Sequence, residues 1–119
     1  MKPLKDLKKF LDRFCHFVDS EIREIKIVDA STILVTLTAQ DSARDFDWVS
    51  VELEFNGVED AKLLDNSKLG FVDMEDGITI ASDEDRYSFG VGRYSSIASI
   101  KNSSCYIECL NIKYGEGLF

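Results

Sequence analysis

Residues 4–28 read LKDLKKFLDRFCHFVDSEIREIKIV, and the spacing of their apolar side chains changes partway along. Up to position 18 the apolar residues recur at steps of three, three, one, three, three and one, which is typical of one face of a helix: Leu4, Leu7, Phe10, Leu11, Phe14, Phe17 and Val18. After Ser20 the period is two, and Ile25 and Ile27 are predicted to share one face of a strand over 23–28. The stretch therefore predicts a helix that leads directly into a sheet.

Most of the remaining sequence has the pattern of short strands. Residues 32–39 are β-branched and apolar, which favours a strand buried on both faces. Residues 49–55 alternate apolar and polar side chains, which favours a strand with one wet face. Further strands are predicted at 58–64, 69–74, 78–81, 86–91 and 104–114, with loops or turns at 29–31, 40–47, 56–57, 75–77, 83–85 and 92–97. The last strand changes phase near Cys109, which predicts a β-bulge there.

These elements indicate an α+β domain that spans residues 1–119. We expect one N-terminal amphipathic helix packed on a mostly antiparallel, curved sheet or small sandwich of about six to eight strands. No second strong helical pattern follows the first, so alternating β-α-β architecture is not expected. One Pro and seven Gly leave little room for a linker that would separate a second domain.

The charge is unevenly distributed along the chain. The formal net charge is −8, and residues 41–85 hold 14 Asp and Glu against three Lys and Arg. Such a surface repels phosphate backbones, so we expect no nucleic-acid partner. It attracts a basic protein, although the same charge also fits a face that only keeps the protein in solution.

The sequence gives no signal for export or membrane insertion. Residues 1–11 contain lysines, but their apolar residues are spaced rather than contiguous. No apolar run approaches the ~18 residues that a membrane-spanning helix needs. The three cysteines are an odd number, which favours reduced thiols. We therefore expect a cytoplasmic protein that does not enter a membrane.

The residues best suited to chemistry are badly placed for it. His16 is the only histidine. Neighbouring positions of a helix point about 100° apart, so Cys15 does not pair with His16. On one strand, Cys105 and Cys109 would lie about 13 Å apart, beyond the reach of one zinc ion or a disulfide. We therefore predict buried structural cysteines and a surface histidine.

The acidic turn at 73–77 invites comparison with a calcium-binding loop. When Gly77 takes the place of the invariant glycine, Val72 and Met74 stand where the first two carboxylates belong. No phosphate-binding lysine motif or complete dinucleotide fingerprint occurs either. We therefore predict no catalytic residue, no metal and no cofactor, and hence a protein that is not an enzyme.

Two stretches share a pattern with a known class of proteins. Residues 51–65 read VELEFNGVEDAKLLD, and residues 104–114 read SCYIECLNIKY. Together they resemble small bacterial immunity proteins, which are found beside secreted polymorphic toxins. In those proteins a hydrophobic strand, a Gly-Val pair and an acidic turn precede a late strand of aromatic and Ile residues. The resemblance implies a non-catalytic protein that neutralises a toxin, and it assigns no role to an individual residue.

The function predicted from the sequence is therefore binding of a protein partner. An inhibitor of this type needs a stable scaffold and a complementary surface, and an acidic one can occlude the basic surface of a toxin domain such as a nuclease. We expect the contacts to come from acidic side chains in predicted loops: Asp41, Asp45, Asp47, Asp83, Glu84 and Asp85.

Two alternatives stay open. One is a small-molecule binding domain, or an unrecognised enzyme, with a pocket between the helix and the curved sheet. Its lining would include Tyr87, Phe89, Tyr94 and Tyr106. The other is a structural or adaptor subunit that pairs through an exposed sheet edge.

Overall fold

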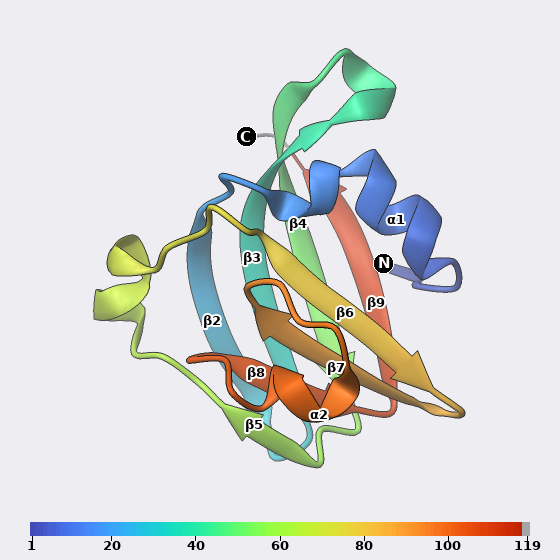
Figure 1. The fold of residues 1–119 in the computed structure, drawn as a ribbon, viewed down its shortest axis with the longest axis vertical. Coiled ribbons are helices and arrows are strands. Elements are labelled where there is room, and N and C mark those ends of the chain that lie inside the picture. The colour runs from blue at the N-terminus through green and yellow to red at the C-terminus, as the bar shows by residue number, and fades with distance from the viewer. Residues whose placement is uncertain (118–119) are drawn as a thin grey trace.

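Two antiparallel sheets and a short helix build the fold, which confirms the mixed helix-and-sheet class (Figure 1). The computed structural model describes residues 1–117. The first sheet has the order β1-β9-β4-β3-β2, and the second has the order β5-β8-β7-β6. The elements are β1 (Lys2–Pro3), α1 (Leu7–Arg13), β2 (Ile22–Asp29), β3 (Thr32–Asp41), β4 (Asp47–Asn56), β5 (Asp60–Lys62), β6 (Ile78–Asp83), β7 (Arg86–Val91), α2 (Ile97–Ile100), β8 (Tyr106–Cys109) and β9 (Asn111–Gly117).

The centre of the first sheet is the long hairpin of β3 and β4. Its register runs without a break from Thr32 opposite Asn56 to Asp41 opposite Asp47. The predicted loop at 40–47 is therefore shorter than expected, because Gln40, Asp41 and Asp47 belong to the strands. The predicted alternation along 49–55 is confirmed, since the apolar residues at 49, 51, 53 and 55 are all buried. This hairpin carries its turn beyond the edge of both sheets (Figure 1).

The predicted final strand at 104–114 is two strands in different sheets. β8 pairs with β5 and β7, whereas β9 pairs with β1 and β4. Leu110, between them, donates its backbone N–H to the Asn56 carbonyl at 3.0 Å. The predicted β-bulge near Cys109 is thus a change of sheet. It allows Ile107 and Ile112 both to be buried, although residues five positions apart on one continuous strand would point to opposite faces.

The stripe at 4–18 forms a shorter helix than predicted. α1 spans only Leu7–Arg13, and the Asp6 side chain caps its first turn by accepting the Lys9 N–H. Cys15, His16 and Phe17 then have φ angles of 55°, 56° and 57°, so residues 15–17 form a left-handed turn. Phe14 and Phe17 are both fully buried, with ring centroids 5.8 Å apart. Burial of two aromatic rings offsets the cost of this backbone conformation.

Two other predicted strands are largely replaced by irregular structure. Over the range 58–64 only β5 is a strand. The range 69–74 is not a strand, because Asn66–Phe71 form a 3₁₀ helix, η3, which the Asp65 carboxylate caps by accepting the Ser67 N–H at 3.0 Å. The Asn66 side chain accepts the Ile25 N–H at 2.9 Å and donates to the Ile25 carbonyl at 3.2 Å. Asn66 therefore covers part of the β2 edge, which would otherwise offer free backbone groups.

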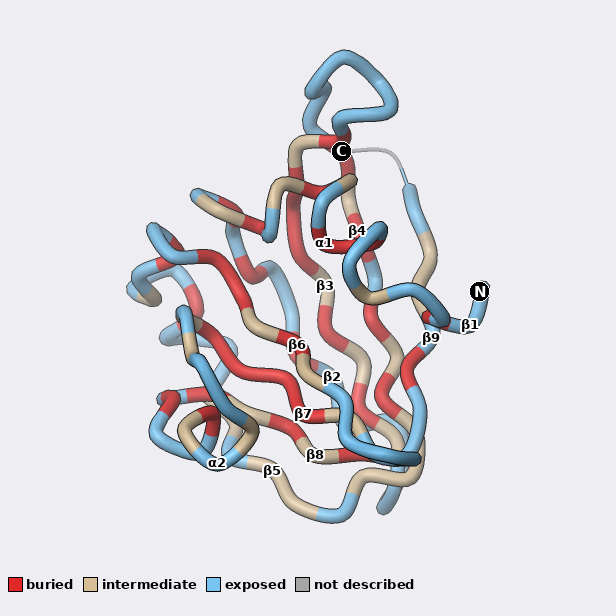
Figure 2. The backbone as a smooth tube through the Cα atoms, turned by 45° about the vertical axis from the view of Figure 1, so that its right-hand side comes forward, coloured by how far each residue is buried: buried red, intermediate tan, exposed pale blue. Residues whose placement is uncertain are grey.

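The core lies between the two sheets and beneath α1 (Figure 2). Phe55 from the first sheet meets Phe89 from the second with ring centroids 5.0 Å apart. Cys105 and Cys109 are buried in the same core, which confirms the prediction of core cysteines. Among residues 1–117, no helix has both the length and the apolar character needed to cross a membrane.

Candidate functional site

The six acidic residues predicted to bind a partner do not form one face. Asp45 and Asp47 are exposed where β3 turns into β4, and Asp83, Glu84 and Asp85 are exposed where β6 turns into β7. These two hairpin turns lie toward opposite ends of the molecule in both backbone views (Figures 1 and 2). A partner that contacts one turn in a compact interface therefore does not contact the other.

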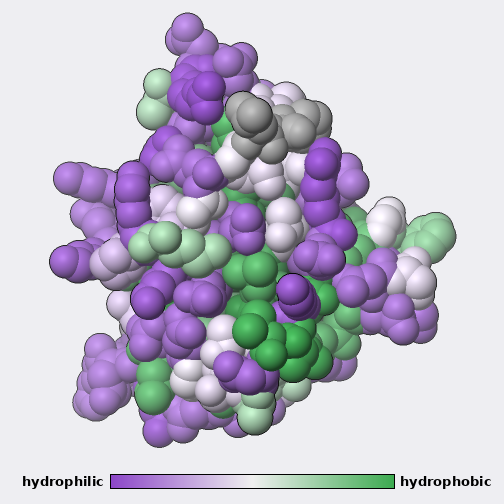
Figure 3. Space-filling model, turned by 180° about the vertical axis from the view of Figure 1, so that it is seen from behind, coloured by the Kyte–Doolittle hydropathy of each residue, from purple (hydrophilic) through white to green (hydrophobic). Residues whose placement is uncertain are grey.

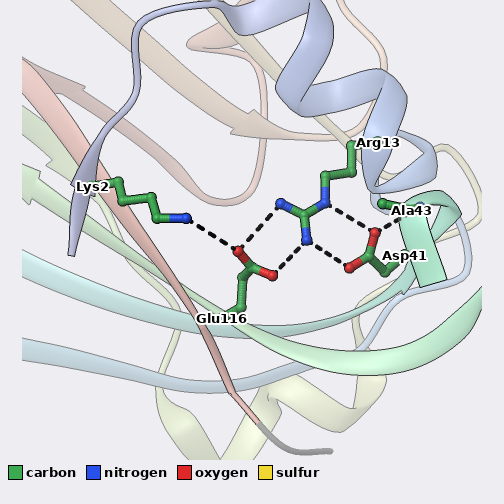
Figure 4. Close-up of polar contacts among 5 residues, drawn as sticks. All are labelled: Lys2, Arg13, Asp41, Ala43 and Glu116. Atoms are coloured by element: carbon green, nitrogen blue, oxygen red, sulfur yellow. Dashed lines mark hydrogen bonds and ion pairs between the residues drawn. The ribbon is translucent and has the colours of Figure 1, made fainter.

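The expectation that Asp41 lies in an exposed loop is wrong. Asp41 is the last residue of β3, and its side chain is fully buried. Arg13 at the end of α1 donates to both of its carboxylate oxygens, from Nε to Oδ1 at 3.0 Å and from Nη2 to Oδ2 at 2.8 Å (Figure 4). Arg13 also donates to Glu116 of β9 at 3.2 and 2.5 Å. A buried carboxylate requires such a partner, which explains why Asp41 points inward.

The Arg13 contacts also set the protonation of Asp41. Hydrogen bonds from the guanidinium hold the pKa of Asp41 below its ordinary value of 3.8, against the opposing effect of burial. The same contacts raise the pKa of Arg13. Both groups are therefore charged at neutral pH and largely cancel each other. Asp41 adds little to the acidic surface, and instead it ties α1 to the end of β3.

The segment above this ion pair, residues 42–48, is named here the β3–β4 tip. Asp41 accepts the Ala43 N–H at its Oδ1 atom at 3.0 Å and the Phe46 N–H at its backbone carbonyl at 2.9 Å. Asp45 and Phe46 have φ angles of 55° and 64°. Two successive non-glycine residues in this region persist only where neighbouring contacts fix them. The tip is therefore a defined structure, and the buried carboxylate of Asp41 anchors it.

The tip exposes two aromatic side chains between its acidic ones. Phe46 is 55% exposed and Trp48 is 39% exposed, while Asp45 and Asp47 flank Phe46. Figure 3 shows a small hydrophobic area among the hydrophilic side chains of this projecting end. The polar composition of 40–47 predicts a loop and gives no role to Phe46 or to the neighbouring Trp48. A signal for them was present in the sequence. Phe46 and Trp48 alternate with Asp45 and Asp47, and neither aromatic is buried in the core.

The other residues singled out in the sequence have structural surroundings. His16 is exposed as predicted, and its Nε2 atom lies 3.0 Å from the Asp12 carboxylate. Burial raises the pKa of the Cys105 thiol to about 11 and that of the Cys109 thiol to about 12, so both are poor nucleophiles. Within residues 1–117, no group of three or more His, Cys, Asp or Glu side chains is arranged to hold a metal ion.

The aromatic residues proposed to line a pocket are dispersed. Phe89 is fully buried in the core, and the Tyr106 hydroxyl donates to the Asp60 carboxylate at 3.1 Å. Tyr94 does line an open cavity beside β6, but Tyr87, Phe89 and Tyr106 take no part in its wall. Of the four residues predicted to line a pocket, only Tyr94 therefore lines this cavity.

No family model matches the chain, and neither the curated proteins nor the solved structures include a significant match to it.

Proposed function

We propose that this protein is a non-catalytic binding protein that docks on a basic protein through the β3–β4 tip. The observation that carries the proposal is the pair of exposed aromatics, Phe46 and Trp48, held on a structured projection between acidic side chains. Aromatic residues dominate the centres of protein interfaces, so two of them exposed on one structured projection favour docking there.

Preorganisation of the tip strengthens this proposal. Ordering a flexible loop upon binding costs affinity, whereas a loop that is already fixed avoids this cost. The Arg13–Asp41 pair, in which Asp41 is buried and Arg13 is half-buried, lies under the tip, and the Gln40 side chain donates to the Phe46 carbonyl at 3.4 Å. The backbone that presents Phe46 is therefore held before any partner arrives.

The charge of the molecule indicates which class of partner fits. The tip itself carries Asp45 and Asp47 against Arg44, so its own net charge is small. The whole chain carries a net charge of −8, which accelerates the approach of a basic protein over long range. In this proposal the contacts of the two aromatics provide the affinity, and the acidic surface raises the association rate. A basic toxin domain is such a partner. The stretches at 51–65 and 104–114, which resemble immunity proteins, point to this class.

Affinity capture with matched variants tests the proposal. Tagged protein is incubated with an extract of the source cells, and retained proteins are compared between the wild type and Phe46→Ala. The control is Phe71→Ala, which removes an 88% exposed aromatic side chain from η3. We expect a basic protein to be retained by the wild type and the control but lost from Phe46→Ala. Equal retention by all three baits would contradict docking through the tip.

A growth assay addresses the toxin-neutralising form of the proposal. A basic toxin domain encoded beside this gene is expressed in a host cell together with this protein. We expect growth to be restored by the wild type and by Phe71→Ala, but not by Phe46→Ala produced at the same level. If the neighbouring gene product is harmless, or if this protein never restores growth, the immunity role is wrong even where partner binding is retained.

A further inference from the structure

An open cavity of about 520 Å³ has no residue of the β3–β4 tip in its wall. Its wall combines the end of α1, the left-handed turn and the first half of β6 with Arg93 and Tyr94. The start of β6 lies beside the left-handed turn (Figure 1). Leu11, Val18, Ile78 and Ile80 give the cavity an apolar surface. Its size and its mixture of apolar walls with a few polar groups match the sites that bind small organic molecules.

The backbone around the cavity is fixed by hydrogen bonds rather than left as a mobile loop. The Thr79 hydroxyl donates to the Gly92 carbonyl at 2.7 Å and accepts the Tyr94 N–H at 3.1 Å. The Gly92 N–H donates to the Gly77 carbonyl at 2.9 Å. The backbone on both sides of Arg93 is therefore held against β6 before a ligand binds, which favours affinity.

The cavity contains one cation that nothing else in the described chain engages. Across residues 1–117, the Arg93 guanidinium makes no hydrogen bond or ion pair, although acidic residues outnumber basic ones in this protein. His16, in contrast, is already paired with Asp12. Arg93 is exposed, and a guanidinium in the wall of such a cavity binds a planar carboxylate with two parallel hydrogen bonds.

The Asp76 carboxylate in the same wall limits the charge of the ligand. A second negative charge on the ligand would meet Asp76 as well as the overall negative field. We infer that the cavity is a binding site for a small organic monocarboxylate with an apolar body, which Arg93 holds by its carboxylate and the side chains of β6 and Tyr94 hold by its apolar part. This site is independent of the proposed docking of a protein on the tip.

Cys15 provides a reporter for this site, because its half-buried thiol lines the cavity. Cys105 and Cys109 are buried in the core, so iodoacetamide should alkylate Cys15 first in the folded protein. The probe ligand is 3-phenylpropanoate, and its uncharged counterpart is 3-phenylpropan-1-ol. We expect 3-phenylpropanoate to slow alkylation of Cys15 in a saturable manner and to shift the amide NMR signals of Gly77, Gly92 and Arg93. The alcohol should bind about tenfold more weakly, because it lacks the charged group.

Matched arginine variants test whether Arg93 binds the carboxylate of 3-phenylpropanoate. Arg93→Gln should weaken 3-phenylpropanoate by about tenfold or more while leaving the binding of the alcohol unchanged. Arg86→Gln is the control, since Arg86 pairs with Glu59 at 3.4 Å and does not line the cavity. The inference is overturned if the acid gives no saturable protection, if the acid and the alcohol bind alike, or if Arg93→Gln binds the acid as the wild type does.

Discussion

Gly77 lies where the turn before β6 touches the left-handed turn, and no other residue type fits there. Its φ angle is +68°, and a Cβ atom at this position would lie 2.0 Å from the His16 carbonyl oxygen. Gly77→Ala must therefore push the two turns apart and also adopt a strained backbone. We expect it to lower the free energy of unfolding by about 2–4 kcal/mol, measured by urea unfolding.

Gly70 supplies the control for this prediction. No atom lies within 4 Å of a Cβ added to Gly70, and Gly70 has no positive φ angle. Gly70→Ala should change the free energy of unfolding by less than about 0.5 kcal/mol. A similar loss for both variants would mean that the close approach of Gly77 to His16 has no special role.

Asp41 gives a prediction about acid stability. Its pKa is lower in the folded protein than the ordinary value of 3.8, chiefly because Arg13 bonds to its carboxylate. Asp41 therefore stabilises the fold above pH 3.8, and this contribution is lost as the pH falls below that value toward the folded pKa. Asp41→Asn should lower the stability at pH 7 by about 2–3 kcal/mol, and the difference from wild type should shrink below pH 3.8.

Unfolding of both proteins by urea at a series of pH values checks this prediction. Asp85→Asn is the matched control, since Asp85 is exposed at the β6–β7 turn. Its stability should follow that of the wild type at every pH. A difference between Asp41→Asn and wild type that stays constant from pH 7 to pH 2 would contradict the assigned role of the Arg13 pair.

At the scale of elements, the η3 helix covers backbone groups at the edge of β2 that would otherwise be free to pair with another strand. Asn66 is bonded to both backbone groups of Ile25, and Ile27 and Val28 on the same strand are exposed. Asn66→Ala should free this edge and raise the hydrogen-exchange rate of the Ile25 amide by at least tenfold. The variant should also self-associate more at high concentration.

Asn102→Ala is the control for the edge prediction, because Asn102 is exposed just after α2 and its backbone N–H donates to the Ser99 carbonyl. Hydrogen exchange followed by NMR measures the amide directly, and light scattering measures association. An unchanged Ile25 amide in Asn66→Ala would show that something other than Asn66 protects this edge.

The elements also show which parts of the secondary structure the periodicity of apolar residues predicts. The alternation at 49–55 predicted β4 well, because one side of that strand faces the core and the other faces water. Periodicity does not predict the left-handed turn, since the spacing of Phe14 and Phe17 also fits a continuous helix and nothing local signals three residues of positive φ. Periodicity also cannot divide 104–114 into β8 and β9, because a β-bulge and a change of sheet produce the same shift in the apolar pattern.

The candidate site was less predictable than the fold. The acidic residues at 41–47 and 83–85 belong to one acidic region of the chain. The two hairpins that carry them, however, point to opposite ends of the molecule (Figure 1). Asp41 was misplaced because its partner, Arg13, is 28 residues away in the sequence. Contacts of this kind depend on where the fold brings the end of α1 relative to the end of β3, which no local pattern reveals.

On the scale of the whole molecule, the net charge of −8 governs how partners approach. Association with a basic partner should slow steeply as salt rises from 20 to 500 mM, whereas dissociation should change little. Replacing Asp83, Glu84 and Asp85 by Asn, Gln and Asn should reduce the association rate and its salt dependence but leave the dissociation rate unchanged. Surface plasmon resonance at several salt concentrations separates the two rates. A salt-independent association rate would contradict long-range steering.

The most direct test of the proposed docking is the dissociation constant of the captured partner for Phe46→Ala, with Phe71→Ala measured beside it. The proposal predicts that Phe46→Ala weakens binding by about 30-fold, mainly through faster dissociation, because an aromatic anchor at the centre of an interface contributes about 2 kcal/mol or more. Phe71→Ala should bind as the wild type does. A dissociation constant for Phe46→Ala within twofold of the wild type, in a variant that unfolds at the wild-type temperature, would contradict the assignment of the β3–β4 tip as the docking site.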